Sequence, residues 1–133
     1  MRYTVRIMTL LLDTYAIIEL FRGSEAGEQV RKLIEKDLDI YLSVLSVYEI
    51  GTVLDREIGE KKSKEYLASI ETHYTIIEVS EEIAHRAIKL RSKYKLPAID
   101  CMIYASAQHI GGKVVSGCKH FKQISNQKDV IIV

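Results

Sequence analysis

The stretch LLLDTYAII, residues 10–18, decides the fold, because its hydrophobic pattern changes from that of a strand to that of a helix at Asp13. Its three leucines end the apolar run VRIMTLLL, residues 5–12, which is typical of a strand buried on both faces of a parallel sheet. Beyond Asp13, residues 14–21 are predicted to form a helix that ends at Gly23. A buried strand that leads directly into a helix is characteristic of parallel α/β folds.

Strand and helix patterns alternate along the rest of the chain. Short apolar or β-branched runs predict further strands at residues 39–43, 74–79, 113–116 and 130–133. Helical patterns are predicted after Ser24, over residues 44–59, over residues 61–72, after Ser80 and over residues 98–112. Strands joined by helices argue for an open parallel α/β sheet with helices on both faces.

The spacing of apolar residues predicts which helix faces reach the core. Met102 and Tyr104 are also expected to pack there. The inward-facing residues expected in the helix after Ser24 and in the helix after Ser80 are Val30, Leu33 and Ile34, and Ile83, Ala84, Ala87 and Ile88.

The composition indicates one compact domain. With 133 residues, of which 47% are hydrophobic, the chain can bury one core but is short for two, so we expect a single domain over residues 1–133. Two cysteines and the absence of a secretory hydrophobic segment favour a reducing compartment. No run approaches the roughly 20 apolar residues of a membrane span, so we expect a cytoplasmic protein.

Charge is divided unevenly along the chain. Residues 1–88 carry 11 Lys and Arg against 16 Asp and Glu, whereas residues 89–133 carry 8 against 2. The basic last third is consistent with a solvated surface and equally with a patch that binds a polyanion such as nucleic acid.

Three carboxylates are expected at the edge of the sheet where the strands end. Asp13 follows the first strand, Glu49 lies in the opening turns of the helix after the second, and Asp100 opens the helix after Pro97. Each has a simpler explanation. Asp13 could cap its helix, Glu49 could form a capping box with Ser46, and Asp100 could be a first-turn acid favoured by the helix dipole.

The coincidence of the three acids favours a metal site. Ligands of open α/β sheets bind beyond the carboxyl ends of the strands, and three carboxylates gathered there would repel one another without a cation. Hard oxygen ligands suit Mg²⁺ or Mn²⁺, which keep waters that can attack phosphorus. The chemistry predicted is metal-assisted hydrolysis of a phosphodiester.

At these residues the sequence resembles a PIN domain, and specifically the small toxins of the VapC type. The motifs that carry the resemblance are LLLDTYAII (10–18), SVLSVYEIG (43–51), LPAIDCMIYASA (96–107) and VVSGCKHF (114–121). The resemblance implies a three-layer α/β/α sandwich with four to five parallel strands. It also implies a Mg²⁺- or Mn²⁺-dependent endoribonuclease, a homodimer and a partner antitoxin that occupies the site.

The resemblance matches individual residues of this chain to positions of the family motif. Asp13, Glu49 and Asp100 correspond to the first three acidic positions, as catalytic residues and metal ligands. Ser116 stands where the family usually has Thr or Ser and is expected to be a fourth catalytic residue, which assists by hydrogen bonding. Cys118 falls at the fourth acidic position, which implies binding of one metal or weak activity, because a thiolate suits Mg²⁺ poorly. A further implication is a natural start at Met8.

Two residues depart from the family pattern, Cys118 and Tyr15, which replaces a small polar residue. A zinc site or a catalytic thiol formed by Cys118 with His120 is less favoured, as is a disulfide with Cys101. The interpretation we favour is a small residue that substitutes for an acid.

Basic residues near the end of the fourth strand are candidates for RNA contacts. They are Lys113, Lys119, His120 and Lys122, with Arg22 reaching the cleft from the first helix. A solvated surface is an equal alternative for each.

Two other functions remain open. One is a PIN-like module that binds RNA or an antitoxin without cutting. The other, an aspartyl-phosphate phosphatase or receiver domain, is disfavoured because Tyr15 stands where a second Asp would be needed.

Overall fold

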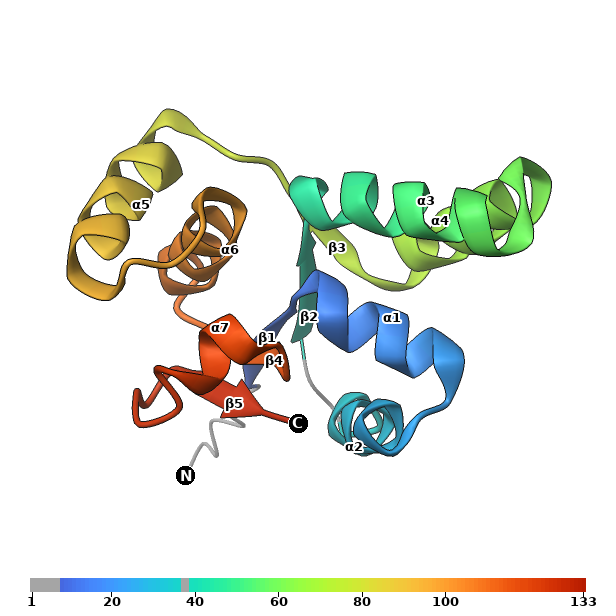
Figure 1. The fold of residues 1–133 in the computed structure, drawn as a ribbon, viewed down its shortest axis with the longest axis horizontal. Helices are drawn as coiled ribbons and strands as arrows, with labels where there is room; N and C mark the ends of the chain where they lie inside the picture. Colours follow the sequence, from blue (N-terminus) through green and yellow to red (C-terminus); the bar gives the residue numbers. More distant parts are fainter. Residues whose placement is uncertain (1–7, 37–38) are drawn as a thin grey trace, which may run out of the picture.

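The computed structural model describes residues 8–36 and 39–133, and its centre is a sheet of five parallel strands (Figure 1). The strands lie in the order β3-β2-β1-β4-β5. The chain therefore extends the sheet on one side of β1 and then crosses over to add two strands on the other side. The strands are β1 (Thr9–Leu12), β2 (Asp39–Ser43), β3 (Thr75–Ile77), β4 (Lys113–Ser116) and β5 (Val130–Ile132).

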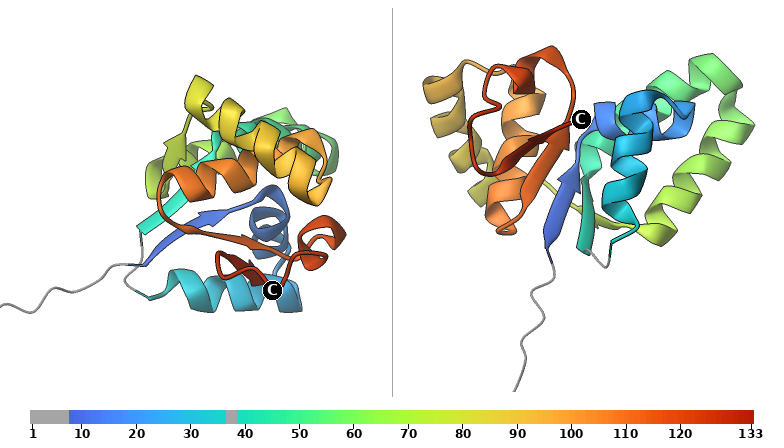
Figure 2. Two further views of the ribbon diagram at one scale, coloured as in Figure 1. Left: turned by 90° about the vertical axis from the view of Figure 1, so that its left-hand side faces the viewer. Right: turned by 90° about the horizontal axis from the view of Figure 1, so that it is seen from below.

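Helices cover both faces of this sheet, as predicted. One face packs against α1 (Thr14–Arg22), α2 (Glu25–Ile34), α3 (Val44–Ile58) and α4 (Glu60–His73). The other packs against α5 (Glu81–Tyr94), α6 (Ala98–His109) and α7 (Lys119–Lys122). Seen from below, the two groups of helices stand on opposite sides of the strands (Figure 2). The predicted three-layer α/β/α sandwich is confirmed.

The leucines of β1 connect the two halves of the core. Leu10 and Leu12 pack in the cluster beneath α1 to α4, whereas Leu11 packs beneath α5 and α6, and none of the three is exposed. Successive side chains of a strand point to opposite faces, so a central strand covered by helices on both faces needs an unbroken apolar run.

Polar side chains begin four of the long helices. Asp13, Ser24, Ser43 and Ser80 each accept a hydrogen bond from a backbone N–H in the first turn of α1, α2, α3 and α5. These bonds satisfy N–H groups that have no partner within the helix. The caps predicted at Ser24 and Ser80 are confirmed.

Several boundaries and one orientation differ from the predictions. The strand predicted over residues 74–79 spans only Thr75–Ile77, and β1 begins at Thr9, with residues 5–7 outside the described residues. Ile88 was expected to face the core, but 65% of its surface is exposed. The buried stripe of α5 passes through positions 83, 87 and 90, and a residue five positions beyond the first lies well off that face.

The remaining packing expectations are largely met. Tyr104 is buried, Met102 is half-buried against the same cluster, and Val30 is buried with Leu33 and Ile34 partly buried beside it. Among the helices of the described residues, none has the length and apolar character needed to cross a membrane.

Candidate functional site

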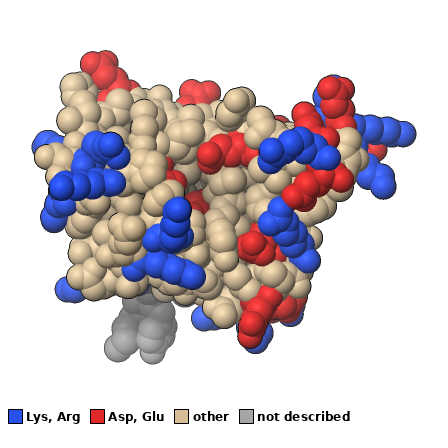
Figure 3. Space-filling view, in the orientation of Figure 1, with Lys and Arg blue, Asp and Glu red and all other residues tan. Residues whose placement is uncertain are grey.

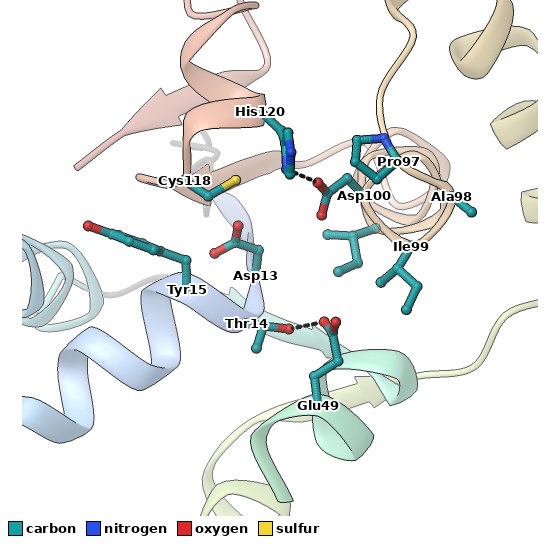
Figure 4. A pocket seen from close by; sticks show the side chains of 11 residues that line it. Asp13, Thr14, Tyr15, Glu49, Pro97, Ala98, Ile99, Asp100, Cys118 and His120 are labelled. Atoms are coloured by element: carbon teal, nitrogen blue, oxygen red, sulfur yellow. Dashed lines mark hydrogen bonds and ion pairs between the residues drawn. The ribbon is translucent and has the colours of Figure 1, made fainter. Parts of the chain in front are cut away.

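A hollow of about 430 Å³ opens at the carboxyl ends of the central strands (Figure 4). This is where the strand order reverses, between β1 and β4. On the molecular surface, acidic atoms lie in a hollow near the middle of one face (Figure 3). Lys and Arg side chains stand on either side of it, with further Asp and Glu side chains on the right (Figure 3). The residues that line the hollow are Asp13, Thr14, Tyr15, Glu49, Pro97, Ala98, Ile99, Asp100, Ile103, Cys118 and His120.

Asp13 is the most deeply placed of the acids. Its backbone N–H bonds to the carbonyl of Val115 in β4, and one carboxylate oxygen, Oδ1, accepts from the N–H of Ala16 at 2.8 Å. The helix-capping explanation is therefore correct, and yet the same carboxyl group lines the hollow. Capping of the helix uses only one of the two carboxylate oxygens of Asp13.

Burial raises the pKa of Asp13 to about 7, because only 3% of the residue is exposed and the charged form loses its hydration. Hydrogen bonding from Ser116 and from the backbone of Ala16 lowers the pKa of Asp13 and so opposes the effect of burial. The negative charges of Asp100 and Glu49 raise this pKa further. Among the described basic side chains, none forms an ion pair with Asp13. The site thus holds a buried carboxyl group whose charge is not balanced by a basic side chain of the described residues.

Glu49 reaches the hollow from the second turn of α3. Oγ1 of Thr14 donates a hydrogen bond to Glu49 Oε1 at 2.6 Å, and Oγ of the buried Ser46 lies 3.1 Å from the same hydroxyl. The predicted capping box between Ser46 and Glu49 is wrong, because α3 begins at Val44 and its cap is Ser43. Glu49 is consequently free to point into the hollow (Figure 4).

Asp100 lies in the first turn of α6, three residues after Pro97. Its Oδ2 is 2.9 Å from Nδ1 of His120, which follows Cys118 by two residues at the start of α7. Burial raises the pKa of Asp100, and the neighbouring His120 opposes that rise. His120, which was predicted from the sequence to contact RNA, lines the hollow and contacts Asp100.

The three predicted acids line one hollow and influence one another electrostatically. They do not form the tightest group of metal-binding side chains, however. Across residues 8–36 and 39–133, the set of three whose donor atoms all lie within 4.8 Å of one another is Asp100, Cys118 and His120. Asp13, Glu49 and Asp100 do not form such a group.

Carboxylates spaced in this way suit a hard divalent ion that keeps part of its hydration shell. Mg²⁺ binds through one or two carboxylates directly and retains several waters, which can bridge to a third acid. The donor set of Asp13, Glu49 and Asp100, together with the missing counter-charge at Asp13, therefore fits Mg²⁺ or Mn²⁺.

Cys118 lines the hollow just beyond β4, which ends at the buried Ser116. Ser116 is fully buried, and its Oγ accepts from the N–H of Cys118 at 3.1 Å, which fixes the turn into α7. The thiol of Cys118 is free and half-buried and makes no helix-capping hydrogen bond. Cys101 is free and buried, so the disulfide with Cys118 is absent.

Tyr15 also lines the hollow, although the family pattern has a small residue there. A Cβ atom at Gly117 would lie 2.4 Å from Cε1 of Tyr15, so the ring packs directly on the backbone of Gly117. The same Cβ would lie 2.7 Å from the carbonyl oxygen of Val133, so position 117 is restricted to glycine by a backbone contact as well as by Tyr15.

The basic residues predicted to contact RNA divide into two groups. Lys119 and Lys122 are exposed on α7, beside the hollow. Lys113 is the first residue of β4 and lies at the opposite end of that strand from Ser116, so its predicted position at the strand exit is wrong. Arg22 ends α1, where it is ion-paired with Glu19 and Glu57 and does not line the hollow.

Sequence reasoning missed Thr14 and underrated His120. Thr14 directly follows the first acid, and a hydroxyl next to a candidate ligand was a signal that could have been used. The contact of His120 with Asp100 joins residues from α6 and α7 that only the crossover through β4 brings together.

The chain was compared with known proteins. A comparison with curated proteins finds no significant match. Among solved structures, this chain is similar to a toxin-antitoxin complex from Klebsiella pneumoniae. The identity is 24% over 92% of this chain and 95% of that chain, with a TM-score of 0.74. VapBC-1 from nontypeable Haemophilus influenzae is similar at 15% identity over 94% and 98% of the two chains, with a TM-score of 0.76.

A third similar structure is Mycobacterium tuberculosis VapC20, a sarcin-ricin loop cleaving toxin, at 15% identity over 78% and 85% of the two chains, with a TM-score of 0.63. At these identities, structural likeness shows the fold alone. The family model described as the PIN domain matches residues 10–127, a range that contains all three predicted acids. With the sheet order and the acidic hollow, this match places the chain in the PIN domain family.

Proposed function

We propose that this protein is a metal-dependent endoribonuclease that acts as the toxin of a toxin-antitoxin pair. The observation that carries the proposal is the buried Asp13 carboxyl group, which shares its hollow with Glu49 and Asp100 and has no cationic side-chain partner within residues 8–36 and 39–133. Membership of the PIN domain family supports the chemistry. The similar structures from toxin-antitoxin complexes support the biological setting.

Each residue of the site has a proposed role. Asp13 and Asp100 bind the divalent ion, Glu49 completes its shell directly or through water, and Thr14 holds Glu49 in place. Mg²⁺ or Mn²⁺, when bound, supplies positive charge for a phosphate oxygen and lowers the pKa of water. Ser116 helps to keep Asp13 ionised, because it opposes the rise in pKa that burial causes.

RNA is proposed to approach along α7. Lys119 and Lys122 are exposed beside the hollow and are free to contact phosphates. Lys113 and Arg22 are less suited, since the first lies at the far end of β4 and the second is held by Glu19 and Glu57.

The partners expected of such a toxin are also proposals. An antitoxin that covers the hollow would prevent RNA from reaching the acids, and the similar structures include toxins solved with their antitoxins. A homodimer, a single domain over residues 1–133 and a cytoplasmic location complete the proposed picture.

The function is tested by cleavage of RNA with purified protein, free of antitoxin, in Mg²⁺ or Mn²⁺. Asp13→Asn keeps an oxygen for the helix cap but removes the charge, so we expect cleavage to fall at least about a hundredfold with the fold retained. Asp55→Asn, at an exposed position of α3 outside the hollow, is the matched control. Equal cleavage by wild type and Asp13→Asn would refute the proposal.

A second candidate function is a PIN-domain module that binds RNA or an antitoxin without cutting. It is favoured by Cys118, which we propose stands in place of a fourth acid at the wall of the hollow. Cys118→Asp separates the two functions. A large gain of Mn²⁺-dependent cleavage indicates an enzyme weakened at this position, whereas no cleavage by either form indicates a binding role.

A further inference from the structure

The hollow contains a second donor set, which differs in chemistry from the three acids. Asp100 Oδ, Cys118 Sγ and a ring nitrogen of His120 all lie within 4.8 Å of one another. They offer one oxygen, one sulfur and one nitrogen. Neither Cys118 nor His120 is needed for a site built from carboxylates, so this set calls for its own explanation.

The fold brings these donors together from two elements. Cys118 and His120 flank the start of α7, and Asp100 opens α6. Figure 4 shows the sulfur, the imidazole and the Asp100 carboxylate around one side of the hollow. The hydrogen bond of Ser116 to the N–H of Cys118 fixes the backbone from which the thiol projects. The donors are therefore held by ordered structure.

The spacing is close to that of a tetrahedral metal site. With metal–nitrogen and metal–oxygen bonds of about 2.0 Å and a metal–sulfur bond of about 2.3 Å, tetrahedral donors lie about 3.3 Å apart for N and O and about 3.5 Å apart when one is S. Asp100 Oδ2 and His120 Nδ1 are already 2.9 Å apart. All three donor atoms lie within 4.8 Å of one another, so a bound ion would have to draw the sulfur closer by at most about 1.3 Å (4.8 − 3.5).

The chemistry of the set selects the metal. Thiolate and imidazole are preferred by borderline ions such as Zn²⁺ and Co²⁺, and both suit Mg²⁺ poorly. Three protein ligands with a fourth position facing a hollow are typical of zinc sites that are accessible to other ligands. We propose that Asp100, Cys118 and His120 bind Zn²⁺, in a site that overlaps the proposed Mg²⁺ or Mn²⁺ site at Asp100.

Sharing Asp100 has a consequence for activity. Zn²⁺ at the triad withdraws this carboxylate from the hard-cation site, so Zn²⁺ is expected to inhibit cleavage that depends on Mg²⁺ or Mn²⁺. This consequence rests on the proposed nuclease function. The zinc site itself rests only on the three donors and is tested without RNA.

Cobalt substitution tests the site directly. Titration of the metal-free protein with Co²⁺ should produce a thiolate-to-cobalt charge-transfer band and the visible bands of a tetrahedral site, and Zn²⁺ should abolish both. Cys118→Ser should lose the charge-transfer band. His120→Ala should weaken Zn²⁺ binding, measured by calorimetry, at least about tenfold, since removing an outer-shell partner alone costs 10- to 100-fold.

Cys101→Ala is the matched control, because Cys101 is buried in the core and is not one of the three donors. It should keep the charge-transfer band. The proposal is overturned if wild type shows no such band, or if the band survives in Cys118→Ser but disappears in Cys101→Ala. Circular dichroism of each variant excludes loss of the fold as the cause.

Discussion

At the scale of the residue, Asp13 has two roles. This one side chain caps α1 through Oδ1 and also lines the hollow. Its burial leaves the charged form poorly stabilised, since neither cap nor hydroxyl supplies a full counter-charge. A group in this condition favours either a proton or a bound cation, and the competition between the two can be measured.

The stability of the metal-free protein should reveal the raised pKa of Asp13. Because the folded pKa of about 7 exceeds the ordinary 3.8, the folded state binds the proton more tightly, and stability falls as pH rises from 4 through 7. Relative to Asp13→Asn, wild type should lose roughly 2 to 3 kcal/mol of unfolding free energy between pH 5 and pH 8. Urea unfolding in EDTA measures this difference.

Saturating Mg²⁺ should reduce the difference in unfolding free energy between wild type and Asp13→Asn at pH 8, because a bound cation stabilises the ionised carboxylate of the wild type. A constant difference in stability between wild type and Asp13→Asn across this pH range would show that the carboxyl group titrates normally.

Thr14 should affect metal binding, because it holds Glu49 in position, and it should have little effect on folding. Thr14→Val removes the hydrogen bond to Glu49 Oε1 but keeps the shape of the side chain. We expect Mn²⁺ affinity to drop about 10- to 100-fold, as for other groups that orient a metal ligand. Thr52→Val is the matched control, because its hydroxyl bonds to the backbone carbonyl of Glu49 and leaves the carboxylate untouched. Similar losses in both variants would count against the positioning of Glu49 by Thr14.

At the scale of the element, local signals account for most of what the sequence predicted. The order of strands and helices could be predicted from local signals, because caps and hydrophobic periodicity act over a few residues. These signals were the leucines at positions 10–12, the capping serines and the glycines that follow helices. Short elements gave weaker signals. The four-residue α7 was not predicted, and the strand around Thr75–Ile77 was predicted too long.

The contact between α1 and α2 explains why one helical glycine cannot be replaced. A Cβ atom at Gly27 would lie 2.0 Å from the carbonyl oxygen of Glu19, whereas one at Gly51 in α3 would meet only the end of the Leu67 side chain at 3.2 Å. Gly27→Ala should therefore lower the unfolding free energy by at least about 2 kcal/mol.

Gly51→Ala is the matched control, since alanine in a helix interior is favoured over glycine by up to about 1 kcal/mol and the Leu67 side chain can move. Its stability should stay within about 1 kcal/mol of wild type in denaturant unfolding. Equal stability of Gly27→Ala and Gly51→Ala would contradict the close approach of α1 and α2.

At the scale of the whole molecule, the site is a product of sheet order. β1 lies between β2 and β4, and this arrangement sets Asp13, Glu49 and Asp100 around one hollow although they are far apart in the sequence. The presence of three acids at one edge was predictable, because each follows a strand or opens a helix near that edge.

The geometry of the cluster was not predictable in the same way. The contact of Asp100 with His120 and the turn of Ser116 onto Cys118 depend on how α6 and α7 pack after the crossover. Such details arise from long-range packing, which local patterns do not encode. The misplacement of Lys113 has a different cause, because the strand predicted over residues 113–116 already made it the first residue, at the end opposite Ser116.

The most direct test of the central claim is the binding of Mn²⁺ to the metal-free protein, followed by calorimetry and electron paramagnetic resonance. If Asp13, Glu49 and Asp100 share one hard cation, Asp13→Asn and Glu49→Gln should each weaken that binding at least about tenfold, while Asp55→Asn binds as wild type does. Unchanged Mn²⁺ affinity in Asp13→Asn would contradict the account, because the buried carboxyl group would then serve only to cap its helix.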